Sequence, residues 1–189
     1  MHQRLRRVAY AGVAGLAMLG GASHALAQAD FQWRGSLAAG QSVEIKGING
    51  AVRASSSGTG QVEVTATRSA RRSNPADVRI DVVPHAGGIT ICAVYPTPPG
   101  GDANRCEPGS GGHANTRNND TMVQFEVHVP AGVDFIGRTV NGDIEANGLQ
   151  SDAQGHSVNG SVKLSTTGLA SANTVNGSVD VTMGRADWP

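Results

Sequence analysis

One five-residue phrase, which occurs three times, constrains the fold of this chain more than any other feature. Its copies occupy residues 140–144, 158–162 and 175–179, and each places Asn-Gly after a valine. The three asparagines lie 18 and then 17 residues apart. A fixed period of about 20 residues that combines a turn signal with β-branched residues is typical of chains whose units stack on one another. The repeat therefore predicts an all-β fold, a single-domain β-solenoid or β-helix of short rungs.

Around each asparagine, apolar and polar residues alternate as they do in strands with one buried face. Apolar residues stand one position before the asparagines and three and five positions after them. We expect the first two of these sets to be buried in parallel columns: Val140, Val158 and Val175, and Ile144, Val162 and Val179. On the outer face, four positions after the asparagines, we expect one row of alternating charge: Glu145, Lys163 and Asp180.

The Asn-Gly pairs are expected to turn the chain between short strands, because both residues tolerate positive φ. They are Asn141-Gly142, Asn159-Gly160 and Asn176-Gly177. If the copies stack, the asparagine side chains form a column with amide hydrogen bonds between rungs. Asn-Gly is also the strongest short signal for a hairpin, so an antiparallel β-sandwich or meander is the alternative fold. A divergent fourth copy at 48–52 and the shared offsets favour the solenoid.

Residues 1–27 have the features of a secretory signal peptide. Three arginines precede an apolar run at 8–20, and Ala25-Leu26-Ala27 offers a cleavage site. The run is shorter than the roughly 20 residues that span a bilayer, so we expect cleavage after Ala27 and no membrane-spanning segment. The mature domain would be residues 28–189, exported to the periplasm or the cell surface.

Removal of this leader leaves 12 basic and 15 acidic residues, a net charge of −3. A mildly acidic chain is not expected to bind nucleic acid. The aromatic content is 4% and there are 26 glycines, which favours a thin, repetitive β core over a helical bundle. The chain stops at Pro189, where a further rung would begin, so we expect it to be a truncated form of a longer protein.

The segment 96–119 is rich in Pro, Gly, Asn and Ser and is predicted to be a long surface loop. Cys92 ends the strand before it, and Cys106 lies within it. Two cysteines in an exported chain most simply form a disulfide, which would contribute roughly 3 kcal/mol on the loop-entropy model. A reactive or metal-binding pair is the competing interpretation, and the absence of CxxC spacing in the sequence disfavours it.

Together with the repeat, the segments 117–120 and 127–133 carry a resemblance to a known family. From Val43 to Val181 the chain resembles the bacterial "putative adhesin" family of unknown function, which consists of exported β-solenoid domains. The resemblance implies an adhesin-like β-solenoid domain. Family members are longer than this chain, and the family name implies adhesion, but it supplies no binding residues to carry over.

No pattern in the sequence indicates a catalytic, cofactor-binding or metal site. The histidines lack the spacing of metal ligands and are interpreted as solvated: His85, His113, His128 and His156. Asp143 and Glu145 resemble the paired acids of a glycoside-cleaving β-helix, but the next copy carries Ser161 and Lys163 instead. A basic turn could hold an anionic envelope polymer, although such charges are usually only solvated: Arg68, Arg71 and Arg72.

The sequence therefore predicts a non-enzymatic exported β-repeat protein of the bacterial cell envelope. It would act as an adhesin or as a surface-binding or scaffolding module for an envelope polymer, a glycan or a protein, without a cofactor. Two alternatives remain at this stage. One is a partner in envelope-stress signalling, and the other is a carbohydrate-active enzyme built on a β-helix.

Overall fold

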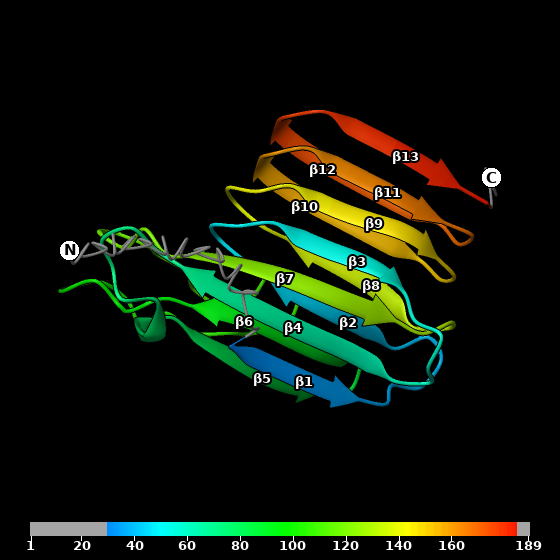
Figure 1. The fold of residues 1–189 in the computed structure, drawn as a ribbon, viewed down its shortest axis with the longest axis horizontal. Helices are drawn as coiled ribbons and strands as arrows, with labels where there is room; N and C mark the ends of the chain where they lie inside the picture. The colour runs from blue at the N-terminus through cyan, green and yellow to red at the C-terminus, as the bar shows by residue number, and fades with distance from the viewer. Residues whose placement is uncertain (1–29, 185–189) are drawn as a thin grey trace, which may run out of the picture.

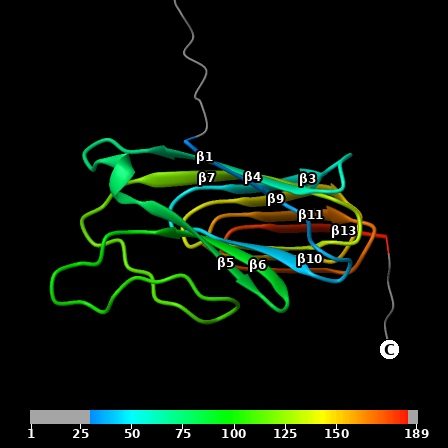
Figure 2. The ribbon, with the colours of Figure 1, turned by 90° about the horizontal axis from the view of Figure 1, so that it is seen from below.

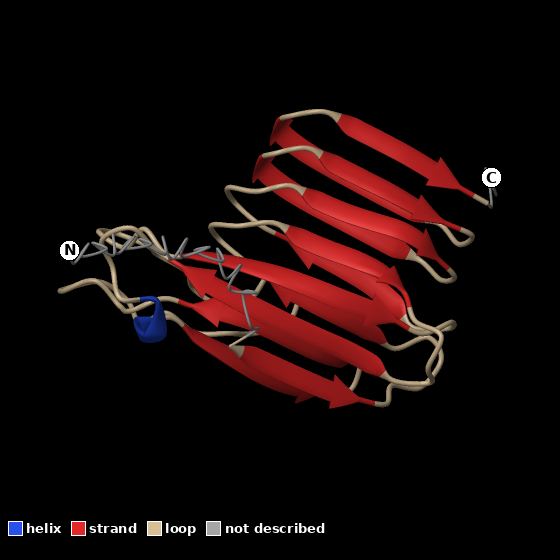
Figure 3. Ribbon diagram, in the orientation of Figure 1, coloured by secondary structure: helices blue, strands red, loops and turns tan. Residues whose placement is uncertain are grey.

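The computed structural model describes residues 30–184, and over this range the protein is all-β (Figures 1 and 3). The prediction of an all-β fold is confirmed. The strands form two mixed sheets, neither of which closes on itself, and a short 3-10 helix, η1 (Pro75–Asp77), interrupts them. Within the same residues no helix is long and apolar enough to cross a membrane. The predicted signal peptide, 1–27, lies outside the described residues.

The two sheets face each other as layers (Figure 2). The seven-stranded sheet has the order β1 (Phe31–Gly35), β4 (Val62–Ser69), β7 (Met122–Val129), β3 (Val52–Ser56), β9 (Ile144–Leu149), β11 (Val162–Thr166) and β13 (Val179–Met183). The six-stranded sheet has the order β12 (Ala170–Asn176), β10 (Ala153–Asn159), β8 (Asp134–Arg138), β2 (Ser42–Lys46), β6 (Gly88–Val94) and β5 (Arg79–His85). Their inner faces enclose one hydrophobic core.

The repeat copies pair in parallel and in register. Val162 of β11 lies opposite Ile144 of β9 and Val179 of β13. β10 likewise runs parallel to β8 and β12. Each Asn-Gly pair leads from a strand of the six-stranded sheet to a strand of the other sheet, so the hairpin interpretation of these pairs is wrong. Among the strands of residues 30–184, the antiparallel pairs are β1 with β4, β4 with β7 and β5 with β6.

The two valine columns have different outcomes. Ile144 and Val162, three positions after the asparagines, are fully buried. The set one position before the asparagines was predicted to be buried, and this is wrong: Val140 is 37% exposed, Val158 39% and Val175 70%. Val179 is also 50% exposed, because β13 is the last strand of its sheet within residues 30–184. The prediction assumed that inward and outward residues alternate without interruption through each corner. In the structure, an odd number of residue steps separates the last inward residue before a corner from the first inward residue after it.

The inward position before each corner holds a hydroxyl residue instead of a valine. It lies two positions before the asparagine, and its side chain donates to the carbonyl of the corner glycine in the preceding copy. These hydrogen bonds are Thr139 to Gly50 (3.1 Å), Ser157 to Gly142 (2.9 Å) and Thr174 to Gly160 (2.7 Å). Each satisfies a carbonyl that the close stacking of the corners would otherwise leave without a partner.

The corner asparagines form the predicted column, which includes the divergent copy. Each Nδ2 donates to the Oδ1 of the preceding asparagine: Asn141 to Asn49 (2.9 Å), Asn159 to Asn141 (2.9 Å) and Asn176 to Asn159 (2.8 Å). These asparagines do not adopt positive φ, contrary to the sequence interpretation, since among residues 30–184 the only non-glycine residue that does is Asn118. Glycine is required because successive corners approach each other closely: a Cβ on Gly142, Gly160 or Gly177 would overlap the backbone of the preceding corner.

The charged row also has the predicted register. Lys163 lies opposite Glu145 on one side and Asp180 on the other. Two further strands lengthen the row, because Arg53 of β3 pairs with Glu145 and with Glu126 of β7. Arg53 forms ion pairs with Glu126 at 3.4 Å and with Glu145 at 3.9 Å. Acidic and basic residues therefore alternate across five adjacent strands, and like charges do not meet.

Cys92 and Cys106 form a disulfide, with their Cα atoms 5.7 Å apart. It ties the long loop to β6. We expect the protein to carry this bridge in an oxidising compartment, because such compartments favour disulfides and the fold holds the two cysteines together. Mass spectrometry of the non-reduced protein should find the peptides of Cys92 and Cys106 linked. Two free thiols after export would contradict this prediction.

Candidate functional site

The loop between β6 and β7 is ordered from within by a buried amide. Asn104 is only 8% exposed. Its Nδ2 donates to the carbonyls of Tyr95 (2.9 Å) and Asn115 (2.8 Å), and its Oδ1 accepts from the Asn115 N–H (2.8 Å). The Tyr95 hydroxyl donates to the carbonyl of Thr121 at 2.8 Å, and burial raises the pKa of Tyr95 to about 12. The two ends of the loop are thus held side by side at neutral pH.

Lys46 holds the loop to the outer face of β2. Its Nζ donates to the carbonyls of Glu107 (2.9 Å), Gly109 (2.9 Å) and Gly111 (2.7 Å). An ammonium group has three donors, and all three are used. Burial lowers the pKa of Lys46 below its ordinary value, while the nearby Glu44 carboxylate opposes this shift. The lysine serves as an anchor for the loop backbone.

Glu44 lies beside this lysine and is 2% exposed. Its carboxylate accepts from Arg138 Nε (2.8 Å), from the Gly109 N–H (2.9 Å) and from the Thr90 hydroxyl (2.8 Å). A buried carboxylate is tolerated when it is paired and hydrogen-bonded in this way. We interpret Glu44 as structural, because its oxygens are already occupied and the loop covers it.

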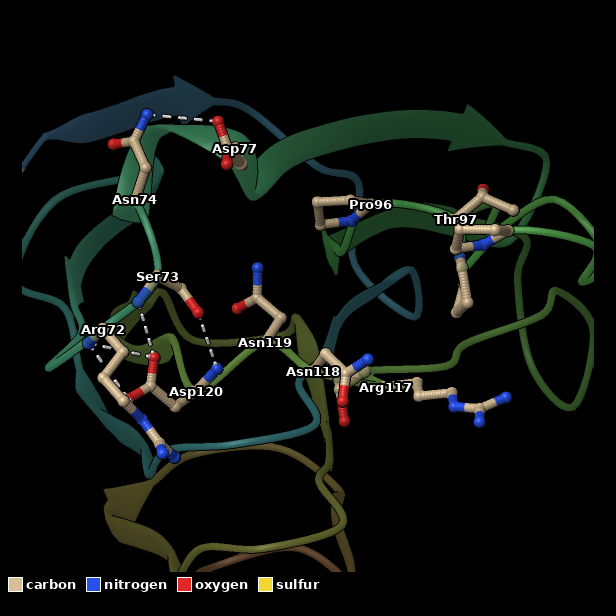
Figure 4. Close-up of a pocket in the computed structure, with 13 residues that line it drawn as sticks. Arg72, Ser73, Asn74, Asp77, Pro96, Thr97, Arg117, Asn118, Asn119 and Asp120 are labelled. Atoms are coloured by element: carbon tan, nitrogen blue, oxygen red, sulfur yellow. Dashed lines mark hydrogen bonds and ion pairs between the residues drawn. The ribbon is translucent and has the colours of Figure 1, made fainter.

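The loop thus anchored forms one wall of a polar groove of about 1060 Å³ (Figure 4). The other wall is the turn around η1, and the floor is the approach to β7. The lining residues are Arg72, Ser73, Asn74, Asp77, Pro96, Thr97, Pro98, Pro99, Thr116, Arg117, Asn118, Asn119 and Asp120. Most are hydrogen-bonding residues, and three prolines stiffen the rim.

Asp120 fixes the geometry between the two walls. It accepts from the Ser73 N–H at 2.9 Å, and its own N–H donates to the Ser73 hydroxyl at 3.1 Å. Arg72 Nε lies 3.7 Å from the same carboxylate. Hydrogen bonds from Ser73, together with those from neighbouring backbone amides, lower the pKa of Asp120 from 3.8 to about 2.

This shift predicts an acid-sensitive wall. Because the folded pKa of Asp120 lies below the unfolded value, its contribution is fully present above about pH 4 and is lost as the pH falls towards about 2. The backbone amide signals of Arg72 and Ser73 should therefore stay constant from neutral pH to about pH 4 and change below it. An Asp120→Asn variant should show no such step. A step centred near pH 4 in the original protein would contradict the assignment.

Two exposed polar side chains in the groove have no partner within residues 30–184. Neither the guanidinium of Arg117 nor the amide of Asn118 makes a hydrogen bond or ion pair there, and both residues are exposed. Asn118 has a φ of 60°, an uncommon conformation for a residue other than glycine. Together they present a fork of donors and an amide to whatever enters the groove.

The basic turn divides between two roles. Arg68 pairs with Asp30 at 2.9 Å and donates to the Val78 carbonyl at 2.6 Å, so it is structural. Arg71 is exposed, and Arg72 reaches the groove. The structure therefore does not bring the three arginines together as one anion-binding cluster.

The other sequence candidates lie outside the groove lining, and several have local partners. Asp143 accepts from the Ser161 N–H at 2.7 Å, and Glu145 accepts from Asn147 at 3.0 Å. His85 contacts Thr90 at 3.1 Å and His128 contacts Ser55 at 3.0 Å, so neither is merely solvated. Burial and the charge of Arg138 lower the pKa of His156. Within residues 30–184, no three His, Cys, Asp or Glu side chains gather as metal ligands.

Sequence reasoning missed Arg117, Asn118, the buried Glu44 and the half-buried Lys46. Apolar and charged residues alternate along 42–46, and no local pattern signals that a loop about 60 residues later covers Glu44 and Lys46. The composition of the loop marked it as exposed but did not indicate that its two ends would meet η1 and enclose a groove.

No protein-family model matches the chain. No curated protein matches it. The solved structure of a "putative cell adhesion protein" from Clostridium sporogenes ATCC 15579 is similar to it, with a sequence identity of 7% and a TM-score of 0.37. The similarity covers 81% of this chain and 99% of that one. A likeness this distant carries no argument about what either protein binds.

Proposed function

We propose that this protein is an exported, non-enzymatic binding module of the bacterial cell envelope, built as a β-solenoid of short rungs. It acts as an adhesin or scaffold and engages a glycan in the polar groove. The observation that carries the proposal is the pair of unpartnered side chains, Arg117 and Asn118, in a groove whose walls are held rigid. Ordered donors and acceptors bind a hydroxyl-rich ligand at little entropic cost.

The rigidity of the walls supports this proposal. One wall is tied by the disulfide, by Asn104 and by Lys46, and Asp120 joins it to the other. A loop held at so many points has little freedom left to lose when a ligand binds. The chemistry suits a polar polymer, because the groove offers amides, hydroxyls and arginines and contains no aromatic side chain.

The test is an array of neutral and anionic oligosaccharides screened with the full chain, followed by variants measured on the glycans it retains. Arg117→Ala and Asn118→Gly should each weaken binding roughly tenfold, the loss expected for one or two well-ordered hydrogen bonds. Asn118→Gly is well matched, because glycine adopts a φ of 60° without strain and only the amide is lost.

Arg79→Ala serves as the control, since Arg79 is an exposed arginine on β5, paired with Asp81 outside the groove lining. It should leave binding unchanged. Binding that falls steeply with added salt would indicate an anionic glycan. Retention of full affinity by both groove variants would refute the groove as the binding site. Cleavage of the bound glycan would instead identify the protein as a carbohydrate-active enzyme.

A further inference from the structure

Five asparagines in this chain are followed directly by glycine, and one of these pairs lies apart from the corners. The other four belong to the corner column, which includes the divergent copy at 48–52. The fifth pair, Asn147-Gly148, lies near the end of β9, between β3 and β11 (Figure 1). An asparagine side chain reacts with its own backbone most readily before glycine, which has no side chain to hinder the attack. Since the five pairs share this sequence, their surroundings decide which of them can react.

This reaction, which makes asparagine a thermolabile residue, removes the side-chain amide through a five-membered ring. The backbone nitrogen of the glycine gives up its proton and forms a bond to the asparagine Cγ, and the bond from Cγ to Nδ2 breaks. The amide nitrogen leaves as ammonia, which carries that proton away. Water then opens the ring at one of its two carbonyls and leaves either aspartate or isoaspartate, whose backbone is one carbon longer. The asparagine side chain and the glycine nitrogen must therefore both be able to move.

At the corners, both groups are held in place. The side chains of Asn141 and Asn159 stand in the amide ladder, and each donates to the asparagine of the preceding copy at 2.9 Å. The N–H of Gly142 donates to the Asn159 carbonyl and that of Gly160 to the Asn176 carbonyl, both at 2.9 Å. Both glycines also lie tightly against the backbone of the preceding corner. Ring closure at a corner therefore requires these hydrogen bonds to break and the corners to separate.

Asn147-Gly148 lies in a β-bulge and is held by fewer contacts. The register between β9 and β11 shifts here, so that the two residues together face the single residue Ser165. Within residues 30–184, Gly148 is paired in register with no residue of β3 or β11, and a Cβ added to it would meet no other atom within 4 Å. The Asn147 side chain is exposed and donates to Glu145 of its own strand at 3.0 Å. It can therefore turn without breaking a ladder between copies.

We propose that Asn147 is a deamidation site of the folded protein and that the stacked corners protect the asparagines within them. The bulge also gives a reason why the fold tolerates the product. A strand with two residues opposite one has already left the regular ladder, so the longer backbone of isoaspartate is accommodated there more easily. The new carboxylate replaces the donor to Glu145 by a like charge and makes the outer face of β9 more acidic. This site is separate from the groove, so the proposal does not depend on the glycan function.

The test follows the modification of the folded protein over time. The full chain is incubated at neutral pH and physiological temperature, and peptide mapping by mass spectrometry measures the fraction of each asparagine converted to aspartate or isoaspartate. Asn147 should convert at least roughly tenfold faster than Asn141 and Asn159, because a corner must first lose two or more hydrogen bonds. The same chain unfolded in urea is the control, and there the three rates should come within severalfold of one another.

Gly148→Asn is the matched variant. Asparagine tolerates the left-handed conformation of Gly148, where φ is 61°, and its side chain would enter open space. The fold should therefore be kept, which the thermal midpoint checks. The added side chain hinders attack by the backbone nitrogen, so conversion of Asn147 should slow severalfold. An unchanged rate in this variant would rule out ring closure through that nitrogen.

Three results in the original chain would overturn the proposal. The first is equal conversion of Asn147 and the corner asparagines in the folded protein. The second is a rate difference of the same size in urea, which would assign the selectivity to neighbouring residues in the sequence. The third is an intact Asn147 in the folded protein after the unfolded chain has been converted.

Discussion

Val162→Asp is expected to abolish cooperative folding of the protein. Val162 is fully buried, in register between Ile144 and Val179, and its Cγ1 lies so close to Gly155 of the facing sheet that one added carbon there would collide with it. A carboxylate at this position would have no cation or water to compensate its burial. The cost should be at least about 4 kcal/mol, against a total stability of roughly 5–15 kcal/mol for a domain.

Urea unfolding followed by circular dichroism measures this effect. Val158→Asp is the matched control, because Val158 belongs to the same copy but points outward at 39% exposure. It should shift the free energy of unfolding by no more than about 0.5 kcal/mol. A Val162→Asp variant with the original midpoint, or a Val158→Asp variant that unfolds, would reverse the inward and outward faces assigned to this copy.

Gly160→Ala is the second substitution with a large expected effect. A Cβ at this position would overlap the carbonyl of Gly142 in the preceding corner, and Gly160 has a φ of 154°, which disfavours alanine. To make room, the two corners must separate, which breaks the hydrogen bond from Gly142 N–H to Asn159 and that between Asn159 and Asn141. Strain and lost hydrogen bonds together should cost about 3–5 kcal/mol.

Gly58→Ala is the control for this experiment. Gly58 lies in the turn between β3 and β4 and does not have positive φ, and a Cβ added to it would meet no other atom within 4 Å. Its substitution should be neutral within about 0.5 kcal/mol. If Gly160→Ala were equally neutral, the corners could not stack as closely as described. Close stacking would then not explain why glycine recurs at the corners.

The stacking register was predictable because it depends on spacing alone. Strands that repeat at 17 and 18 residues with the same apolar offsets can pair in parallel only if equivalent residues meet, and Lys163 does lie between Glu145 and Asp180. The burial of Ile144 and Val162 follows from the same alternation. These features need only local sequence and the period of a strand.

The outward direction of Val140, Val158 and Val175 was not predicted, although a signal was present. Thr139, Ser157 and Thr174 recur two positions before the asparagines, and small hydroxyl residues at a repeated position indicate hydrogen bonds to backbone. Composition favoured the valines as the inward residues. The corner geometry decided the matter, because each turn changes the phase of the alternation.

The sequence by itself determined the class of the fold, the parallel register of the repeat copies and the ladders of asparagine and charge, because each depends on residues at fixed short spacing. Only the tertiary structure decided which valines face the core and where a groove forms. Those outcomes depend on contacts between distant segments, such as Lys46 with Gly109 or Ser73 with Asp120. Such contacts arise from the folding of the whole chain, and no local pattern encodes the partner of either group.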